Sequence, residues 1–362
     1  MLSGWLTEDG GLTTAAMWLV PNPSEFSVRR WMLIGTVASI LYLWHISTLS
    51  RRPRNSPCPD HGIMLRILYG LFSTWAAEKI LAHALHTKRD EAQAEQVGGT
   101  VSVVTGPPEL RVKVVPILGA AFGGNYAYLI WDETDLDRRA IVVDPADPYP
   151  VLRAAAEEKL NLEVLLTTHW HFDHASGNST MAREVPGLRV VASDREVARV
   201  PAVTERLADE QRIEVGNLVI TAHTVPGHTL GSAVFEISSR VLPGTPSAAF
   251  TGDTLFCGGC GRLFEGSALQ LHASLRRLRH RLKPDCRIFS GHEYAEMLLS
   301  MAVRAEPANK AARAKLQAVR ALRAQKLPSV PSTMAEELAY NPWMKATPVN
   351  LAVLCGCGPM AG

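Results

Sequence analysis

The feature that most constrains this chain is a cluster of potential metal ligands directly after a short apolar run. The sequence THWHFDH occupies Thr168–His174 and follows a run typical of a buried strand. One residue separates His169 from His171, so in extended backbone their side chains face the same side. Asp173 and His174 follow on the turn. Four such donors on one loop suit two neighbouring ions, and imidazole with carboxylate favours zinc, iron or manganese over calcium or magnesium.

Three further donors stand at the ends of later apolar runs. His228 lies in PGHT, Asp253 in TGD and His292 in SGHEY. The order of an apolar run, a turn of small residues and a ligand thus recurs three times. A single histidine in such a place is more often a core residue. Seven donors in this order predict a binuclear metal site.

The sequence pattern from about residue 111 is typical of a mixed sheet with interleaved helices. A helix is expected at 151–160. Strands are expected at 112–118, 125–131, 140–145, 162–169, 188–193, 218–227, 233–238 and 247–253. Runs of both kinds in alternation predict an α/β domain whose sheet faces are covered.

Composition excludes some functions and favours a reducing compartment. The chain has 362 residues, with 37 basic and 35 acidic side chains, so its charge balance does not indicate nucleic acid as a partner. The six cysteines show no disulfide framework, which favours a reducing compartment. Cys257 and Cys260 have CxxC spacing. A turn of small residues is the preferred interpretation, with a structural zinc or a redox pair as alternatives.

An apolar stretch near the N-terminus predicts a membrane anchor. Trp31–Leu49 is nineteen residues long and lacks Asp, Glu, Lys and Arg, which matches the length of a single transmembrane helix. Arg51, Arg52 and Arg54 follow it, so the positive-inside tendency places the rest of the chain in the cytosol or in a matrix-like space, with a mitochondrial membrane as one candidate.

The segment between this stretch and the α/β domain has two parts. Residues 63–85 predict an amphipathic helix in the membrane interface, with a second span or a helix packed on the domain as alternatives. Residues 87–109 are polar and rich in Gly and Pro, which indicates a linker. The predicted divisions are an N-terminal segment 1–30, a transmembrane helix 31–49, an amphipathic helix and linker 50–110, a catalytic domain 111–295 and a C-terminal helical substrate-binding region 296–362.

Several motifs resemble those of one enzyme family. The histidine-rich loop with the three later donors resembles the metallo-β-lactamase superfamily. GDTLFCGGCGRLFEG at 252–266, GHEYAE at 291–296 and VPSTMAEELAYNPWM at 330–344 are similar to segments of glyoxalase II, the hydroxyacylglutathione hydrolase. The similarity runs from about Val112 to Met344. It implies an αββα sandwich with a C-terminal helical extension. An anchor ahead of such a domain is also similar to the membrane-associated paroxysmal nonkinesigenic dyskinesia branch of this family.

The resemblance assigns the donors to two divalent ions, zinc foremost, with iron or manganese as alternatives. It implies that Asp253 bridges the ions together with a hydroxide and that Asp173 also orients this nucleophile. Asp144, in VVDP, is either a carboxylate that orients a ligating histidine or a residue of a strand-end turn. The first ion would be held by His169, His171 and His228, and the second by Asp173, His174 and His292.

The implied reaction is hydrolysis of a glutathione thioester such as S-lactoylglutathione to glutathione and a hydroxy acid. The family binds glutathione through a basic residue and tyrosines, which Arg262 and Tyr294 match. Phe264 stands where the family often has Tyr, and Lys345 is the one basic residue after the NPWM segment. The basic helix at 307–327 is either a solvated face or a contact for a substrate carboxylate.

Two alternatives to the thioester hydrolase remain open. One is an iron-dependent enzyme resembling the persulfide dioxygenase of the same fold, which lacks the C-terminal helical motif. The other is a membrane-bound interaction protein with little turnover, against which the complete set of seven donors argues.

Overall fold

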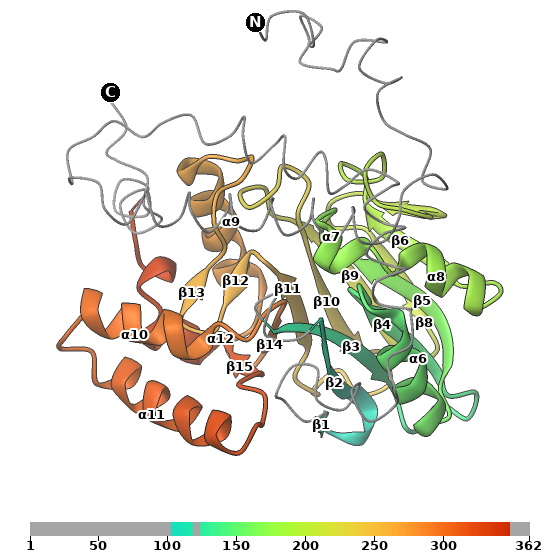
Figure 1. Ribbon diagram of the computed structural model, residues 1–362, viewed down its shortest axis with the longest axis horizontal. Helices are drawn as coiled ribbons and strands as arrows, with labels where there is room; N and C mark the ends of the chain where they lie inside the picture. Colours follow the sequence, from blue (N-terminus) through green and yellow to red (C-terminus); the bar gives the residue numbers. More distant parts are fainter. Residues whose placement is uncertain (1–102, 119–123, 348–362) are drawn as a thin grey trace, which may run out of the picture. The chain divides into compact units, whose positions relative to one another are not determined.

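The computed structural model describes residues 103–118 and 124–347 (Figure 1). The predicted transmembrane helix at 31–49, the predicted helix at 63–85 and the last residues of the chain lie outside this part. Within the described residues, no helix is both long enough and apolar enough to span a bilayer.

Two sheets make up the centre of the domain. The first has seven strands in sequential order: β1 (Val103–Thr105), β2 (Arg111–Ile117), β3 (Asn125–Trp131), β4 (Arg139–Val143), β5 (Asn161–Thr167), β6 (Arg189–Ser193) and β7 (Glu205–Leu207). The pairs from β1 to β4 are antiparallel, and those from β4 to β7 are parallel. The bounds of four strands match the predicted ranges within three residues at each end, namely β3, β4, β5 and β6. β1 lies upstream of residue 111, in the segment predicted as linker, so that prediction is wrong at this point. A three-residue strand beside Gly and Pro shows too little periodicity to be recognised in the sequence.

The second sheet has six strands in the order β15-β14-β11-β10-β9-β8. Its strands are β8 (Arg212–Val215), β9 (Leu218–Thr224), β10 (Ala233–Ser239), β11 (Ala248–Gly252), β14 (Arg287–Ser290) and β15 (Ser332–Thr333). Only the β11–β14 pair is parallel. A small hairpin of β12 (Leu255–Phe256) and β13 (Gly259–Cys260) follows β11. Cys257 and Cys260 lie in this hairpin as free thiols, consistent with the turn interpretation.

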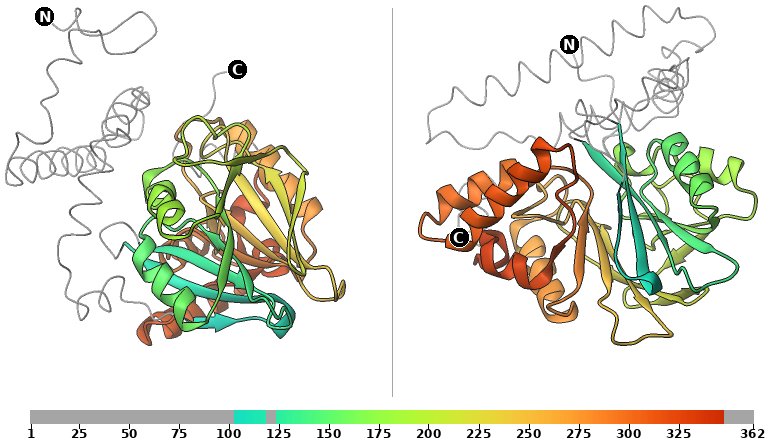
Figure 2. Two further views of the ribbon diagram at one scale, coloured as in Figure 1. Left: turned by 90° about the vertical axis from the view of Figure 1, so that its right-hand side faces the viewer. Right: turned by 90° about the horizontal axis from the view of Figure 1, so that it is seen from below.

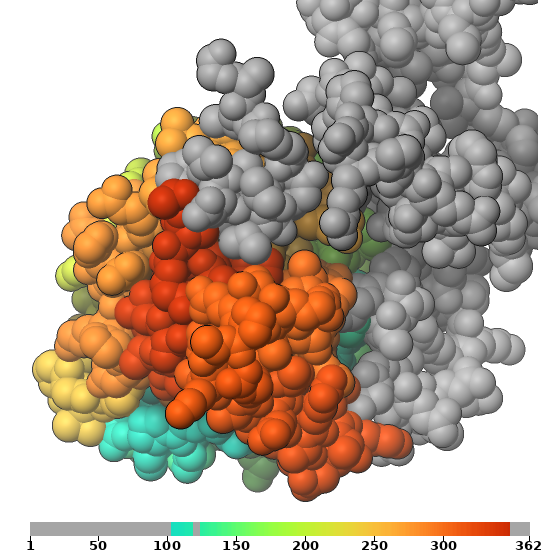
Figure 3. Space-filling view, turned by 90° about the vertical axis from the view of Figure 1, so that its left-hand side faces the viewer, coloured from blue at the N-terminus to red at the C-terminus, as the bar shows by residue number. Residues whose placement is uncertain are grey.

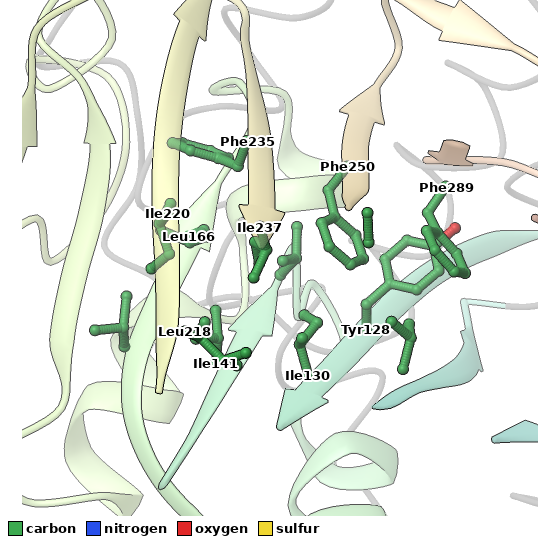
Figure 4. Packing of buried hydrophobic residues seen from close by; sticks show 14 of the residues in the cluster. Tyr128, Ile130, Ile141, Leu166, Leu218, Ile220, Phe235, Ile237, Phe250 and Phe289 are labelled. Carbon is green, nitrogen blue, oxygen red and sulfur yellow. The ribbon is translucent and has the colours of Figure 1, made fainter. Parts of the chain in front are cut away.

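The sheets pack face to face, and alternation along the strands decides which residues meet. On β10, Phe235 and Ile237 point into the core between the sheets, while Val234 points to the opposite face. Phe250 and Phe289 stack at a centroid distance of 5.2 Å, and Tyr128 of the first sheet packs against both (Figure 4). Successive side chains point to opposite faces of a strand. Strands β10, β11 and β14 of the second sheet therefore bury one face against the first sheet and the other against the helices outside it.

Helices cover the outer faces of both sheets (Figures 1 and 2). On the first sheet lie α6 (Pro148–Glu157), α7 (Phe172–Ala175) and α8 (Asn178–Glu184). On the second lies α9 (Ala268–Arg281), whose Leu271, Leu275 and Leu278 share a buried cluster with Val234 and Ile288. The arrangement is the predicted αββα sandwich.

The C-terminal helices form a further layer beside the second sheet. These are α10 (Ala295–Ala305), α11 (Lys310–Ala324) and α12 (Met334–Tyr340), and the short 3-10 turn η4 (Pro342–Met344) follows α12. Another short 3-10 turn, η2 (Pro108–Leu110), precedes β2 in the first sheet. α10 and α11 pack on each other through Leu299, Ala312, Leu316 and Val319. Figure 3 shows them forming a continuous part of the surface on this side. This is the helical extension that the VPST…NPWM segment predicts.

Candidate metal centre

The histidine-rich loop leaves the end of β5 and turns directly into α7. His171 precedes the first residue of α7, and its carbonyl accepts hydrogen bonds from the backbone N–H groups of His174 and Ala175. This single turn places Asp173 and His174 on the helix while His169 and His171 remain on the extended segment. The loop therefore presents four donors at the ends of the parallel strands, where binding sites of α/β sheets form.

Three imidazoles converge on the first predicted ion position. His169 Nε2 lies 3.0 Å from His171 Nδ1, and His228 Nε2 lies 3.0 Å from the same atom. All three rings are buried. His228 comes from the turn after β9, so this group unites the loop after β5 with the second sheet.

The second group lies beside the first and includes both carboxylates. His174 Nε2 and His292 Nε2 are 3.3 Å apart, and His292 Nε2 is 3.4 Å from Asp173 Oδ2. Asp253 stands between the groups: its oxygens lie 3.3 Å from His174 Nε2, 3.3 Å from His292 Nε2 and 3.5 Å from His228 Nε2. Donor atoms within 4.8 Å of one another form three triads, namely His169–His171–His228, His169–His174–Asp253 and Asp173–His174–His292.

The electrostatics of the two groups differ. Burial lowers the pKa of His169, His171 and His228 and keeps these imidazoles neutral, which is the form that binds metal. Burial also opposes charge on His292, but Asp253 and Asp173 outweigh it and raise the pKa of His292 to about 9. The carboxylates thus stabilise positive charge at the second group.

The hydrogen bonding of the donor atoms indicates that a pair of cations fits between them. His171 Nδ1 faces two other imidazole nitrogens at hydrogen-bond distance, and a single proton cannot satisfy three lone pairs that point at one spot. Asp253 Oδ1 is buried and accepts no well-aligned hydrogen bond within the described residues, although His174 Nε2 lies 3.3 Å away. Buried polar atoms without partners are uncommon and costly. Cations between these atoms would satisfy them.

Further contacts orient the donors from outside. The Asp144 carboxylate lies 2.9 Å from His174 Nδ1 and also accepts from the backbone N–H and hydroxyl of Thr168. This contact agrees with the orienting interpretation of Asp144. His228 Nδ1 donates to the carbonyl oxygen of Arg262 at 2.8 Å. Asn125 donates from Nδ2 to the Asp173 carboxylate at 3.1 Å. Sequence reasoning missed Asn125 and the Arg262 carbonyl, because no motif distinguishes them.

A glycine lets two of the donors meet. A Cβ at Gly291 would stand 2.6 Å from His174 Cε1 and 2.7 Å from Asp253 Oδ1. A Cβ at this position would force His174 or Asp253 to move, so glycine before His292 lets the two donors converge. The small residue in the recurring turn before each ligand therefore has a steric reason at this position.

The predicted substrate residues lie in three different environments. Phe264 packs edge-on against the rings of His171 and His228, and Tyr294 stacks on His292 at a centroid distance of 4.6 Å. Aromatic rings therefore flank both donor groups. The Arg262 side chain is exposed. Lys345 is not brought to this cluster by any described contact: its Nζ is paired with Glu306 at 2.8 Å.

Trp170 is a site feature that the motif alone did not reveal. Its indole packs edge-on against His171, and the Arg199 guanidinium lies 3.6 Å from the ring centroid. Glu265 accepts from Trp170 Nε1 and pairs with Arg199. Trp170, Arg199 and Glu265 thus form a wall beside the first donor group. The spacing of the two histidines carries no information on the residue between them.

Comparison with known proteins agrees with this geometry. Residues 120–292 match the metallo-beta-lactamase superfamily, and residues 293–356 match the C-terminal model of hydroxyacylglutathione hydrolase. The chain is 37% identical over 238 residues to the hydroxyacylglutathione hydrolase-like protein of Gallus gallus, which covers 66% of this chain and 81% of the relative. The corresponding Mus musculus protein is 36% identical over the same shares.

A solved structure supports the fold alone. A metallo-beta-lactamase from Staphylococcus aureus subsp. aureus COL superimposes with a TM-score of 0.52 at 21% identity, covering 69% of this chain and 66% of that one. The sandwich, the converging donors and the C-terminal match point to the same group of proteins. The chain belongs to the hydroxyacylglutathione hydrolase, or glyoxalase II, family of the metallo-beta-lactamase superfamily.

Proposed function

We propose that this protein is a metal-dependent thioester hydrolase that cleaves S-acylglutathione, with S-lactoylglutathione as the model substrate, to glutathione and a hydroxy acid. The observation that carries the proposal is the convergence of seven side chains into two adjacent donor groups that share Asp253. The family of the chain supports the hydrolytic reaction and the glutathione moiety.

The donor groups suggest how two ions are held. We assign His169, His171 and His228 to the first ion and Asp173, His174 and His292 to the second, with Asp253 between them. Five imidazoles with two carboxylates and no thiolate suit zinc, and iron and manganese tolerate the same ligands. Two such ions would lower the pKa of a water molecule and supply positive charge for the developing oxyanion.

The residues of the chain contribute orientation and exclusion of water. Asp173 is the more accessible of the two carboxylates, with 15% of its side chain exposed, and Asn125 fixes its rotamer. It is placed to accept a proton from, and so to orient, an attacking water. Phe264 and Tyr294 border the site with ring faces and edges, which limits bulk water beside the thioester. The leaving thiolate is stable near neutral pH, so no strong general acid is needed.

The glutathione part of the substrate is expected to bind to residues beside the donor groups. We propose that Arg262 binds a glutathione carboxylate, that Tyr294 donates a hydrogen bond and that Phe264 contributes apolar contact only. Lys345 can join them only by leaving Glu306. A surface ion pair of this kind contributes about 0–1 kcal/mol, so a substrate carboxylate can compete for the lysine.

The test is a panel of thioesters offered to the full-length, metal-analysed protein. S-lactoylglutathione, other acyl-glutathiones and matched acyl-coenzyme A esters are compared by release of free thiol. Two ions per chain with preference for glutathione esters support the proposal. One iron per chain with oxygen uptake on a glutathione persulfide would favour the dioxygenase. Absence of turnover in protein that holds two ions would favour an interaction protein.

We also propose that residues 31–49 anchor the chain in a membrane, with the catalytic domain in the cytosol or a matrix-like space. The support is the uncharged, apolar composition of this stretch and the arginines after it. Replacing Ile40 and Leu41 by Lys should release the protein from membranes washed at alkaline pH, because a charge at the centre of a span is costly. Exchanging the same two residues for Leu and Ile is the matched control. Release of both variants, or of neither, contradicts the anchor.

A further inference from the structure

The side chain of Glu337 on α12 is fully buried and surrounded by hydrogen-bond donors. Its Oε1 accepts from Ser332 Oγ at 2.5 Å and from Tyr340 OH at 2.6 Å. Its Oε2 accepts from Asn341 Nδ2 at 2.9 Å and from the backbone N–H of Gly258 at 3.0 Å. None of the ion pairs among the described residues involves Glu337. Four directed donors hold this carboxyl in one position.

The contact with Gly258 reaches the tip of the β12–β13 hairpin. Asn341, four residues after Glu337, donates from Nδ2 to the carbonyl oxygen of Gly259 at 3.0 Å and lies 3.4 Å from that of Phe256. A Cβ at Gly258 would stand 2.6 Å from the side chain of Leu299 on α10. The hairpin tip therefore sits in a close-fitting socket formed by the C-terminal helices.

One end of the same hairpin belongs to the donor groups, and the other end contacts them. Asp253 lies two residues before β12, and Arg262 lies two residues after β13 and accepts from His228 Nδ1 at 2.8 Å. Between them, a Cβ at Gly261 would stand 1.7 Å from the Asp253 carbonyl oxygen and 3.1 Å from His228 Nδ1. No free space separates these three residues. A shift of the hairpin consequently moves Asp253 and the acceptor of His228 together.

We propose that Glu337 is a positioning residue for the metal centre: through the β12–β13 hairpin it fixes Asp253 and the tautomer and orientation of His228. The inference rests on the proposed metal site. It gives the C-terminal helices a role in assembling the centre in addition to any contact with substrate. Contacts that orient metal ligands commonly change metal affinity by about 10- to 100-fold when removed.

The neighbouring residue supplies a matched control. Glu336 lies one position earlier on α12, where its carboxylate caps Thr333 and pairs with Lys315 at 2.8 Å. Its side chain is 42% exposed and faces away from the hairpin contacts. Glu336→Gln and Glu337→Gln make the same chemical change on the same helix. Only the second places an amide against the donors that hold the hairpin.

The test compares zinc affinity, steady-state kinetics and the tautomer of His228 in full-length wild type, Glu336→Gln and Glu337→Gln. Glu337→Gln should retain the wild-type near-ultraviolet circular dichroism, bind one of two zinc ions about 10- to 100-fold more weakly and lose kcat with little change in KM. Nitrogen-15 NMR of the metal-free protein should show the protonated Nδ1 of His228 in wild type and Glu336→Gln, and loss of that single tautomer in Glu337→Gln. Wild-type zinc affinity and an unchanged His228 signal in Glu337→Gln would overturn the inference.

Two provisions keep the outcome decisive. If Glu337→Gln fails to fold, Tyr340→Phe removes one of the four donors while keeping the ring, and it should shift the His228 signal and zinc affinity in the same direction by a smaller factor. Wild-type values for Tyr340→Phe would then overturn the inference. If wild-type protein binds no second ion, the proposed function fails, while the NMR comparison of metal-free proteins still decides the role of Glu337.

Discussion

The Asp144 carboxylate lies 2.9 Å from Nδ1 of His174, and both side chains are buried. This contact directs the opposite ring nitrogen of His174 toward Asp253 and His292. Asp144 has a positive φ of 49° at the end of β4, a conformation that Asp and Asn adopt more readily than most residues. The strand-end turn and the orienting carboxylate are thus two aspects of one residue, and the backbone geometry serves the contact.

Asp144→Asn tests this contact without adding backbone strain. The amide would oppose the donors of Thr168 or deprive His174 of its acceptor. We expect metal affinity at the second ion position to fall by about 10- to 100-fold, with the other position less affected. Competition titration with a zinc chelator measures both. Asp137→Asn, at an exposed residue of the β3–β4 turn, is the control. Equal affinities for the two variants contradict the role of Asp144.

Asp253→Ala removes the carboxylate that faces both donor groups. Since residues that merely orient ligands cost about 10- to 100-fold, loss of this shared ligand should lower kcat/KM by more than about 100-fold and reduce the metal content. Steady-state thioester hydrolysis and elemental analysis of the same samples provide the readouts. Wild-type turnover by the Asp253→Ala protein would count against the assigned site.

Phe264→Tyr tests the assignment of the substrate rim. The ring is only partly buried and packs against His171 and His228, so an added hydroxyl would lie beside the donor groups. One new hydrogen bond to a glutathione ester, of about 0.5–1.5 kcal/mol, should lower KM roughly 2- to 10-fold and leave kcat unchanged. Tyr294→Phe is the complementary change and should raise KM. If neither variant alters KM for any glutathione ester, the thiol moiety binds elsewhere.

Glu196 should make stability depend on pH. It is buried beside Thr229, to whose hydroxyl it is hydrogen-bonded, and burial raises its pKa to about 7, with Arg199 lowering and Glu265 raising it. A folded-state pKa above the ordinary value of a glutamate means that the native state holds the proton more tightly than the unfolded state. The contribution of this group is therefore present at low pH and lost as pH rises through about 7.

Glu196→Gln removes this dependence because the amide does not ionise. Between pH 5 and pH 8 the free energy of unfolding of the variant should gain about 2 kcal/mol relative to wild type. Urea unfolding at the two pH values measures the difference. Glu214→Gln replaces a carboxylate whose side chain is 56% exposed and should run parallel to wild type. A Glu196→Gln curve that also runs parallel to wild type would show that Glu196 is ionised in the native state throughout.

Much of the fold could be predicted because local pattern and buried face coincide. The run NYAYLIW predicts a strand at 125–131, which β3 occupies without a shift, since all seven residues are buried. The seven donors could be named because each follows a strand end, and strand ends are where loops can carry chemistry. The small strand β1 could not be predicted, because three residues carry too little periodicity to outweigh the adjacent glycine and prolines.

What escaped prediction depends on contacts between distant parts of the chain. The Arg262 carbonyl orients His228 across 34 positions of sequence, and a backbone oxygen has no signature in an amino-acid sequence. Arg199 reaches Trp170 from the β6–β7 connection, where a basic residue is ordinarily solvated. Lys345 is the one basic residue after the NPWM segment, whereas its pairing with Glu306 depends on how α10 ends.

The central claim is that two cations lie side by side among these seven side chains. Crystals of the zinc-loaded chain, measured at wavelengths on either side of the zinc absorption edge, test it most directly. The account predicts two anomalous peaks, one among His169, His171 and His228 and one among Asp173, His174 and His292, with Asp253 in contact with both. A single peak, or peaks away from these residues in protein shown to contain zinc, would contradict it.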